Sequence, residues 1–436
     1  MANRRKTSKQ SQTTANKVRG VVAAASKVKV KKKYRKYVLP ITLLAIVAIV
    51  IGCWFYDRSS LTFSDFFYDV FYEVFHPTPP VDAMEHEIAA APANPGTASG
   101  EMLVHFVDVG QGDCIIIQFP DGKNMIVDGG PRKAKNAVLA YIKAYGITEF
   151  EYLMLTHTDE DHCGSIDDVI LNTDVKYMYV PGVTREQIST AVYKQFLAAT
   201  ENEVKEVSGA QVLISAAGMT FGNPDFGYQL EIVVPEADFH ESVKGSSAEL
   251  INAVSPIMFL TFGDTKICFT GDSNEKNEPL FLEKIKQIDR NGDGRVDEED
   301  EAWYDCDVLK VAHHGSRTSS KQAFLDVVKP EIAVIQAGAG NNHGHPTPEA
   351  LARLENTVLT DGKKGAEIYC TIDCGSIVLR VTADEAGKTS REVLPQKQPE
   401  KKSASAIGAG RLWALAERGK RFSVPRFGSP ILCAAA

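Results

Sequence analysis

The 436 residues, 44% of them hydrophobic, suffice for one large globular domain or two smaller ones. The formal net charge of −8 hides an asymmetry, because residues 1–37 hold thirteen of the 48 Lys and Arg residues and no Asp or Glu. The rest of the chain carries the remaining 35 basic residues against 56 acidic ones. This balance excludes a global field that attracts nucleic acid, so a polyanion must be bound by a local groove or by metal ions.

Residues 38–55 follow this basic head and contain no charged residue over eighteen positions, which is just long enough to span a hydrocarbon core. By the positive-inside rule, residues 1–37 lie in the cytoplasm and the chain after about residue 57 lies outside the cell. A cleaved signal peptide, or a lipoprotein with "VIGC" ending at Cys53, is the alternative. A 37-residue basic lead is long for either. The sequence therefore predicts a single-pass anchor in the cell membrane.

Residues 56–100 form a juxtamembrane segment and linker. The aromatic stretch "LTFSDFFYDVFYEVF" at 61–75 suits a short helix at the membrane interface, or a disordered or self-associating stalk. A Pro/Ala/Gly-rich linker follows it. At the other end of the chain, residues 385–436 are polar at first, and we expect a disordered tail there.

Residues 101–384 have the pattern of a globular domain. Short apolar runs such as "CIIIQF", "YLMLTH" and "KICFTGD" predict strands, and segments such as "NAVLAYIKAYG" and "PEALARLEN" predict helices. Many strands with interleaved helices indicate a layered α/β domain. The eight cysteines are scattered without a C-x-x-C zinc module. Pairing of Cys370 with Cys374 across a tight turn is open.

The motif "HTDEDH" at residues 157–162 places four potential metal ligands directly after a predicted strand, on a loop. They are His157, Asp159, Asp161 and His162. Acids this close together repel one another unless positive charge lies between them, so a divalent metal is the economical explanation. A solvated acidic loop is the alternative for an isolated match.

Other motifs weaken that alternative. Six of the ten histidines lie in three short motifs, "HTDEDH", "KVAHHGS" and "NNHGHP". Between the first two stands "CFTGDS", in which Asp272 also follows an apolar strand. Each motif comes at the end of a predicted strand and before a glycine-containing turn. Scattered structural histidines would not recur in that position.

Taken in order, "VDVGQGDC", "IVDGG", "THTDEDHCGS", "FTGDS", "LKVAHHGSRTSS" and "GHPTPEAL" resemble the motifs of the metallo-β-lactamase fold. More specifically, residues 101–382 are similar to the extracellular hydrolase domain of ComEC-type competence proteins, which serve DNA uptake. The resemblance implies an αββα sandwich whose metal site lies at one edge, between two sheets.

The resemblance also implies the roles of individual residues around two divalent metals, zinc or manganese. The implied metal ligands are His157 and Asp159 for one metal, Asp161 and His162 for the other, Asp272 as the bridge, and His345 to complete the site. The implied catalytic residues are Asp161, His313 and His314, one of the two histidines being a ligand or a general acid. The residues that would orient the ligands are Asp108, Asp113 and Asp128.

The sequence departs from the lactamase-like pattern at two places that affect the metal. The pattern has histidine where Asp159 stands, and its separate third-motif histidine, between His162 and Asp272, has no clear match. His240 is the only candidate, and we interpret it as a surface residue. A site with more oxygen ligands favours manganese, with zinc still open. Three basic residues lie near the "HHGS" motif, namely Lys310, Arg317 and Lys321. They either add positive charge to the rim of the site or are ordinary surface charges.

Two metals in such a site would activate water for attack on a phosphorus or carbonyl centre, and His313 or His314 would protonate the leaving alkoxide. We therefore expect an outward-facing phosphodiesterase or DNase. With one predicted span, the chain would need a partner to form a DNA-uptake channel. The alternatives are a hydrolase of a small phosphodiester, of wall-polymer phosphocholine or of a lactam, and a non-catalytic module that its metals stabilise.

The segment "DRNGDGRVDEED", residues 289–300, matches an EF-hand-like calcium loop, with Gly294 at the sharp turn. The ligands expected in this frame are Asp289, Asn291, Asp293, Arg295 through its carbonyl, Asp297 and Asp300. Aspartate at the last position is shorter than the usual glutamate, so we expect weak affinity. A polar loop with chance spacing is the alternative. Calcium would make this insertion rigid without a part in catalysis.

Overall fold

The computed structural model describes residues 100–184, 187–188, 190–239, 243, 248–384 and 386–397. The predicted basic head, membrane anchor and linker lie outside these residues, as does most of the predicted tail. Within the described part of the chain, no helix has the length and apolar character needed to cross a membrane. The anchor at residues 38–55 therefore stays a prediction.

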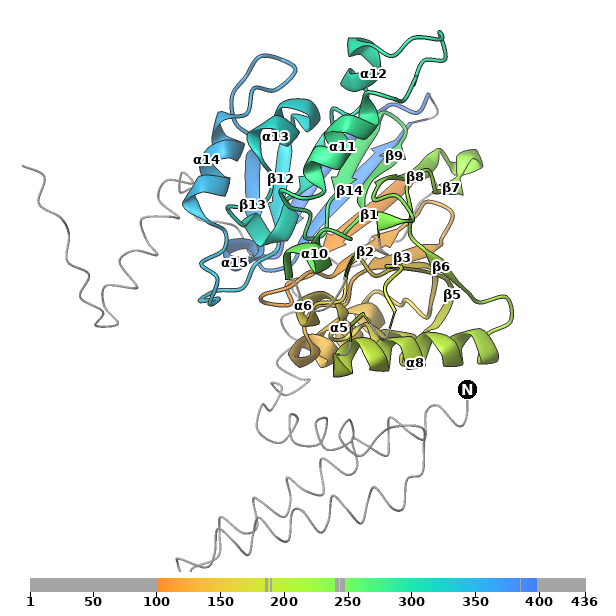
Figure 1. Cartoon of the computed structure of the whole chain (residues 1–436). Coiled ribbons are helices and arrows are strands. Elements are labelled where there is room, and N and C mark those ends of the chain that lie inside the picture. The colour runs from red at the N-terminus through yellow and green to blue at the C-terminus, as the bar shows by residue number, and fades with distance from the viewer. Residues whose placement is uncertain are drawn as a thin grey trace, which may run out of the picture.

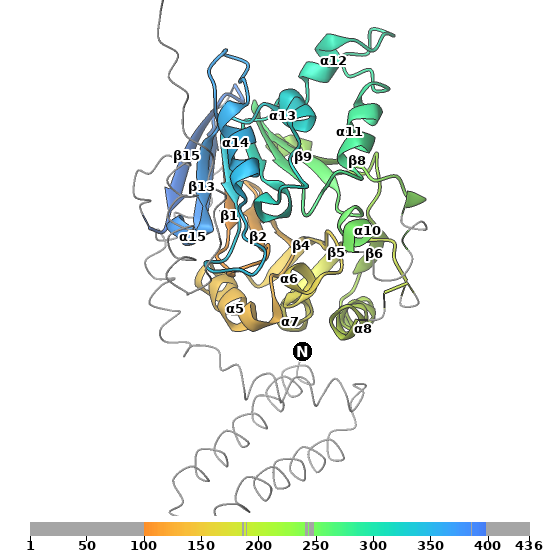
Figure 2. The same ribbon diagram turned by 60° about the vertical axis from the view of Figure 1, so that its left-hand side comes forward.

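Two β-sheets lie face to face in the middle of the domain (Figures 1 and 2). The first sheet has eight strands in the order β15-β14-β1-β2-β3-β4-β5-β6. They are β1 (Glu101–Phe106), β2 (Ile115–Gln118), β3 (Asn124–Val127), β4 (Glu149–Met154), β5 (Asp174–Val180), β6 (Gln211–Ile214), β14 (Ile377–Ala383) and β15 (Thr389–Pro395). The second sheet has seven strands in the order β13-β12-β11-β10-β9-β8-β7. They are β7 (Thr220–Asn223), β8 (Tyr228–Val234), β9 (Ile257–Phe262), β10 (Thr265–Phe269), β11 (Val308–Lys310), β12 (Ile332–Ile335) and β13 (Glu367–Cys370).

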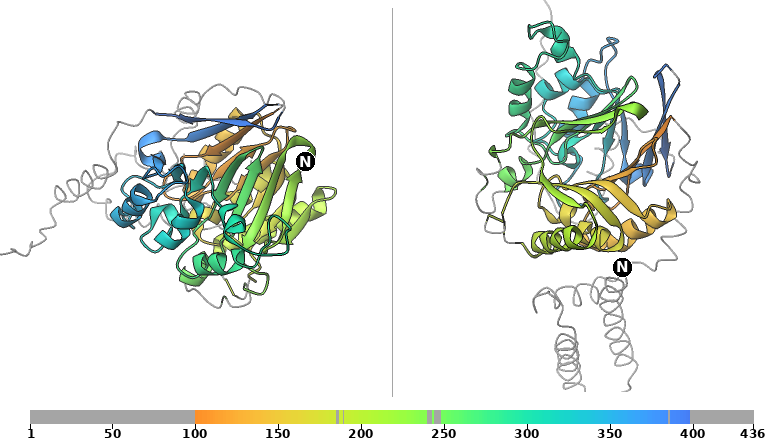
Figure 3. Two further views of the ribbon diagram at one scale, coloured as in Figure 1. Left: turned by 90° about the horizontal axis from the view of Figure 1, so that it is seen from above. Right: turned by 90° about the vertical axis from the view of Figure 1, so that its right-hand side faces the viewer.

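Helices cover the outer face of each sheet, as the views in Figure 3 also show. Against the first sheet pack α5 (Lys135–Ala144), α7 (Ile166–Asn172) and α8 (Ala191–Glu206). Against the second pack α11 (Glu278–Ile285), α13 (Gln322–Val328) and α14 (Pro348–Asn356). The shorter helices are α6 (Glu160–Cys163), α10 (Ala248–Asn252), α12 (Glu298–Ala302) and α15 (Thr371–Cys374). The two-sheet α/β fold expected from the sequence is confirmed, and its layers are consistent with an αββα sandwich.

Continuous apolar runs such as "CIIIQF" arise because the central strands are covered on both faces. In β2, Ile115 and Ile117 face the core between the sheets, whereas Ile116 faces the core under the helices. Successive side chains of a strand point to opposite faces, so each layer takes every second residue. A single strand such as β2 therefore contributes side chains to both the core between the sheets and the core under the helices.

The parallel strands place their carboxyl ends along a common edge of the sandwich. In the first sheet β3, β4, β5 and β6 are parallel, and in the second β10, β11, β12 and β13 are parallel. Ligands of α/β proteins commonly bind outside the carboxyl ends of such strands. The "IVDGG", "HTDEDH", "FTGDS" and "HHGS" motifs all follow these ends directly.

The C-terminal boundary of the domain lies further along the chain than expected. The tail expected to be disordered from residue 385 contains β15, which pairs with β14 over seven residues. Arg391 of β15 also forms ion pairs with Asp307 and Glu331, which precede strands of the second sheet. Strand pairing and these ion pairs therefore order a segment that is too polar for its sequence to predict a strand.

The described cysteines are all buried thiols, and none forms a disulfide. Cys370 and Cys374 belong to this set, so the pairing left open by the sequence is absent from the structure. Cys53 and Cys433 lie outside the described residues.

Candidate metal centre

The loops that carry the motifs pack closely because glycine leaves room for neighbouring backbone. At Gly112 of "GQGD", φ is +138° and an added Cβ would lie 2.2 Å from the carbonyl oxygen of Asp161. At Gly164, an added Cβ would lie 2.3 Å from the backbone nitrogen of Arg132. Because larger residues would force these loops apart, the glycines bring Asp113 and Asp128 next to the "HTDEDH" segment.

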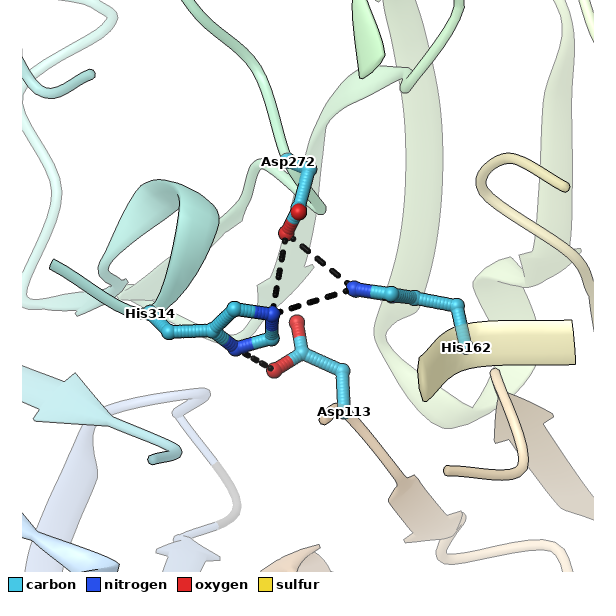
Figure 4. Close-up of side chains that lie close together, drawn as sticks. All are labelled: Asp113, His162, Asp272 and His314. Atoms are coloured by element: carbon cyan, nitrogen blue, oxygen red, sulfur yellow. Dashed lines mark hydrogen bonds and ion pairs between the residues drawn. The ribbon is translucent and has the colours of Figure 1, made fainter. Parts of the chain in front are cut away.

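Four buried side chains converge at the centre of this edge, as Figure 4 shows. They are Asp113, His162, Asp272 and His314, and one ligand atom from each lies within 4.8 Å of the others. His162 Nε2 lies 3.2 Å from Asp272 Oδ1 and 3.3 Å from His314 Nε2. His314 Nε2 lies 3.6 Å from the same Asp272 oxygen. Both sheets contribute, since His162 follows β4 whereas Asp272 and His314 follow β10 and β11.

The rings of His162 and His314 are each oriented by a hydrogen bond at the Nδ1 atom, on the side away from Asp272. His162 Nδ1 lies 2.7 Å from Asp128 Oδ2, and Asp128 accepts bonds from the backbone amide and hydroxyl of Thr156. His314 Nδ1 lies 2.9 Å from the carbonyl oxygen of Gln336. Histidines that bind metals usually donate their other N–H to a carboxylate or carbonyl in this way. Both Nε2 atoms are thereby directed at Asp272.

Asp113 lies behind His314, at its Nδ1 atom, where its Oδ1 is 3.2 Å away. Its other oxygen forms a 2.6 Å ion pair with Lys310, and both side chains are almost completely buried. The interpretation of Lys310 as a rim charge is therefore wrong, because β11 lies inside the second sheet. Arg317 is exposed, and Lys321 forms a half-exposed ion pair with Glu275.

A second group of side chains surrounds the other oxygen of Asp272. His157 Nε2 lies 3.8 Å from Asp272 Oδ2 and 3.8 Å from Asp159 Oδ2. His313 Nε2 lies 3.5 Å from Asp272 Oδ2. On the Oδ1 side, Asp161 Oδ2 approaches His314 Nε2 at 3.3 Å. Asp272 thus stands between a His157–Asp159 half and an Asp161–His162 half, the same division that the resemblance implies.

The remaining expected site residues lie at different depths. His345 is almost buried, and its ring centroid lies 5.3 Å from that of His313. Asp108 is exposed, and its carboxylate accepts the amide of Gly110 across a turn. It is not part of the converging group. His240 lies outside the described residues.

The buried charges shift one another's pKa values in opposite directions. Burial lowers the pKa of His314, but Asp272 and Asp113 outweigh this and raise it to about 10. His162 behaves likewise, and its pKa lies well above the ordinary value because of Asp272 and Asp128. Burial and repulsion from Asp161 and Asp272 raise the pKa of Asp159 to about 7. The carboxylates therefore create a negative environment that favours a cation.

The residues present fit one or more divalent cations. Among the described residues, His157 Nε2 is buried without a hydrogen-bond partner. Leaving such an atom unsatisfied costs about 1–3 kcal/mol. Two ring nitrogens that meet 3.3 Å apart beside a carboxylate are likewise well placed for a shared cation. Imidazole and carboxylate donors suit zinc and manganese alike.

One residue near the site gave no signal in the sequence. Asn252, at the end of α10, is 5% exposed and lies within 3.5 Å of both Asp272 Oδ2 and His313. It stands in the apolar stretch "LINAVSPIMF", outside every motif quoted above. Only the folded chain brings it to the metal-binding edge.

Most of the predicted calcium loop is exposed, but its last three residues belong to α12, and Asp300 there is buried. Asp289 accepts the amides of Gly292 and Gly294, and Asp300 accepts those of Arg290 and Asp297. Among the described residues, the group around Asp272 is the one set of His, Cys, Asp or Glu side chains with converging ligand atoms. The calcium site therefore stays a prediction.

Comparison with known proteins gives a family and a set of relatives. The sequence model of the metallo-beta-lactamase superfamily matches residues 107–338, more than half of the 436 residues. ComE operon protein 3 of Bacillus subtilis is 26% identical over 277 residues, which cover 59% of this chain and 31% of that protein. Recombination protein 2 of Haemophilus influenzae is 26% identical over 257 residues, or 58% of this chain and 26% of that protein.

A third relative is competence protein ComA of Neisseria gonorrhoeae, 24% identical over 262 residues, which cover 58% of this chain and 30% of that protein. The chain thus spans less than a third of the length of these curated relatives. The family match at residues 107–338 contains all four converging side chains, Asp113, His162, Asp272 and His314. The resemblance to competence proteins is confirmed.

Proposed function

Because this chain belongs to the metallo-beta-lactamase superfamily, whose members are generally metal-dependent hydrolases, we propose that it hydrolyses phosphodiesters and that DNA is its main substrate. The observation that carries this proposal is buried Asp272, with one oxygen toward each half of a His/Asp site. The names of the relatives, which refer to competence and recombination, support nucleic acid over a lactam. Because the chain is acidic, a polyanion such as DNA would have to be bound through cations held locally at the site.

The halves of the site have separate roles. His157 and Asp159 would hold one divalent cation, Asp161, His162 and His314 the other, with Asp272 between them. When bound, such cations activate water and neutralise charge on the phosphate oxygens. Asp128 and the Gln336 carbonyl fix the rings of His162 and His314. Asp113 and Lys310 form a buried support behind His314.

We assign proton transfer to His313 rather than to His314. The His313 side chain is 25% exposed, whereas that of His314 is 1% exposed, so His313 is the histidine that a substrate reaches. Burial lowers the pKa of His313, which leaves its ring neutral near pH 7. A neutral imidazole accepts the proton of the attacking water and can then donate it to the leaving alkoxide. His345, beside His313, forms the adjoining wall.

Three further expectations complete the proposal. The single-pass anchor would place the domain outside the cell, and a separate channel protein would act with it if it serves DNA uptake. Calcium would bind residues 289–300 and stiffen the segment before α12. These proposals rest on the sequence patterns alone.

The test uses the full-length chain in detergent, stripped of metal and reloaded with Mn²⁺ or Zn²⁺. It is given single- and double-stranded DNA, a chromogenic phosphodiester and a lactam. Asp272→Asn removes the central charge, and Asp326→Asn, on an exposed helix face, makes the same change away from the site. Metal-dependent DNA cleavage that only Asp272→Asn abolishes would support the proposal. Cleavage of the lactam alone would refute it.

A further inference from the structure

Asn252 lies on the His157–Asp159 side of the site. It ends α10, immediately before the turn into β9, and α10 lies close to α6 in the ribbon (Figure 1). Its amide group lies 3.3 Å from His313 Nε2 and 3.5 Å from Asp272 Oδ2. On its other side it faces the carbonyl oxygen of Ala248 and a carboxylate oxygen of Asp159. A single buried amide therefore touches three segments of the site.

The neighbours of this amide favour one of its two orientations, because with the NH₂ group toward Asp272 and His313 its contacts are long, at 3.5 and 3.3 Å. If its oxygen faced Ala248 and Asp159, it would meet only acceptors. In the opposite orientation the NH₂ group donates to the Ala248 carbonyl at 2.8 Å and to Asp159 Oδ2 at 3.2 Å. Amide orientations are assigned from such networks, so the oxygen of Asn252 faces Asp272 and His313.

This orientation places two oxygen atoms side by side. The amide oxygen of Asn252 then lies at the position 3.5 Å from Asp272 Oδ2. The Nε2 atom of His157, which has no hydrogen-bond partner in the described part of the chain, lies 3.8 Å from that same carboxylate oxygen. Two acceptors and a bare ring nitrogen, all buried, are costly unless positive charge lies between them. A divalent cation supplies it, because the Thr156 hydroxyl donates to Asp128 and therefore accepts the Nδ1–H of His157, which leaves the Nε2 atom of the neutral ring without a proton.

We propose that Asn252 contributes its amide oxygen to the cation held by His157, Asp159 and Asp272, while its NH₂ group fixes the carboxylate of Asp159. The inference rests on the proposed metal-dependent function and deepens it. Asn252 lies in the chain between His162 and Asp272, where the lactamase-like pattern has a separate histidine and this sequence has no match. An oxygen donor in place of a nitrogen donor shifts this half of the site from Zn²⁺ toward Mn²⁺.

The test measures metal binding and does not depend on turnover. Full-length wild type and Asn252→Ala, both stripped of metal, are titrated with Mn²⁺, and free Mn²⁺ is followed by electron paramagnetic resonance. The same proteins are loaded with Co²⁺, whose visible absorption reports the number and type of ligands. Asn252→Asp restores an oxygen donor. Asn172→Ala removes an exposed amide that donates to the Asp168 carbonyl in its own helix, and serves as the control.

We expect wild type and the control to bind two Mn²⁺ ions. Asn252→Ala should bind one as before and the other about 10–100-fold more weakly, with an altered Co²⁺ spectrum, while the metal-free form still unfolds cooperatively. Asn252→Asp should recover both ions. Unchanged affinities and spectrum in Asn252→Ala would overturn the inference, as would loss of fold or of both ions together. If wild type binds two ions as expected but cleaves no phosphodiester, the proposed substrate fails and the assignment of Asn252 stands.

Discussion

The buried ion pair between Lys310 and Asp113 offers a sharp test of how the site is supported. The two charges lie 2.6 Å apart and are almost completely buried. Replacing Lys310 with methionine keeps the length of the side chain and removes its charge, so Asp113 is left ionised in the interior. Breaking a buried pair on one side costs about 3–5 kcal/mol. We expect the lower end, about 3 kcal/mol, because His314 remains 3.2 Å from Asp113.

The assay is urea unfolding of the metal-free chain, so that bound ions do not contribute to the free energy of unfolding. Lys310→Met, Asp113→Asn and the double variant form a double-mutant cycle. The double variant should cost about 2 kcal/mol less than the sum of the single ones, because neither charge is then left alone. Lys286→Met is the control, since the Lys286–Glu283 pair is exposed on both sides and should contribute less than about 1 kcal/mol. Additive effects, or a Lys310→Met cost no larger than the control, would refute the reasoning.

Three other predictions concern metal affinity, pH and calcium. Asp128→Asn should weaken Mn²⁺ or Zn²⁺ binding about 10–100-fold, because a neutral amide replaces the carboxylate that lies 2.7 Å from His162 Nδ1. Unchanged metal affinity in isothermal titration calorimetry would contradict this prediction. Burial raises the pKa of Glu278 from 4.5 to about 6, so the folded state binds its proton more tightly. Stability contributed by the protonated form should therefore fall by about 2 kcal/mol in total as the pH rises from well below 4.5 to well above 6, in wild type relative to Glu278→Gln. Parallel pH profiles of the two proteins would count against it. Calcium at 10 mM should stabilise the chain by about 1.4–2.7 kcal/mol if the dissociation constant is about 0.1–1 mM; an equal rise in melting temperature in Asp293→Ala would refute binding at this loop.

The sequence predicts the fold well where strands are apolar and covered on both faces. Runs such as those of β2, β4 and β10 are recognisable because most of their residues are buried. Three short strands, β6, β7 and β13, together with β15, were missed. They lie at the sheet edges, where only part of each strand is covered and the apolar signal is weak. The motif histidines were found because they follow recognisable strands.

The parts of the site that were not predicted depend on contacts between distant segments. Lys310 has the composition of a surface residue, and only its 2.6 Å approach to Asp113, 197 positions earlier, explains its burial. Asn252 belongs to no motif, and its place beside Asp272 and His313 follows from the turn between α10 and β9. Sequence spacing contains no information on either contact.

The last strand of the domain determines how a recombinant fragment should be cut. Ending the chain at residue 384, where the composition changes, removes β15 and uncovers the outer edge of β14 along Ile377–Ala383, while its other edge stays paired with β1. An uncovered strand edge of that length is a template for pairing with another molecule. Such a fragment would tend to self-associate or aggregate, and the resulting oligomer would be an artefact of the truncation. A fragment that extends through residue 397 keeps the strand and the backbone bonds of Gln396 and Lys397 to Ser376 and Cys374.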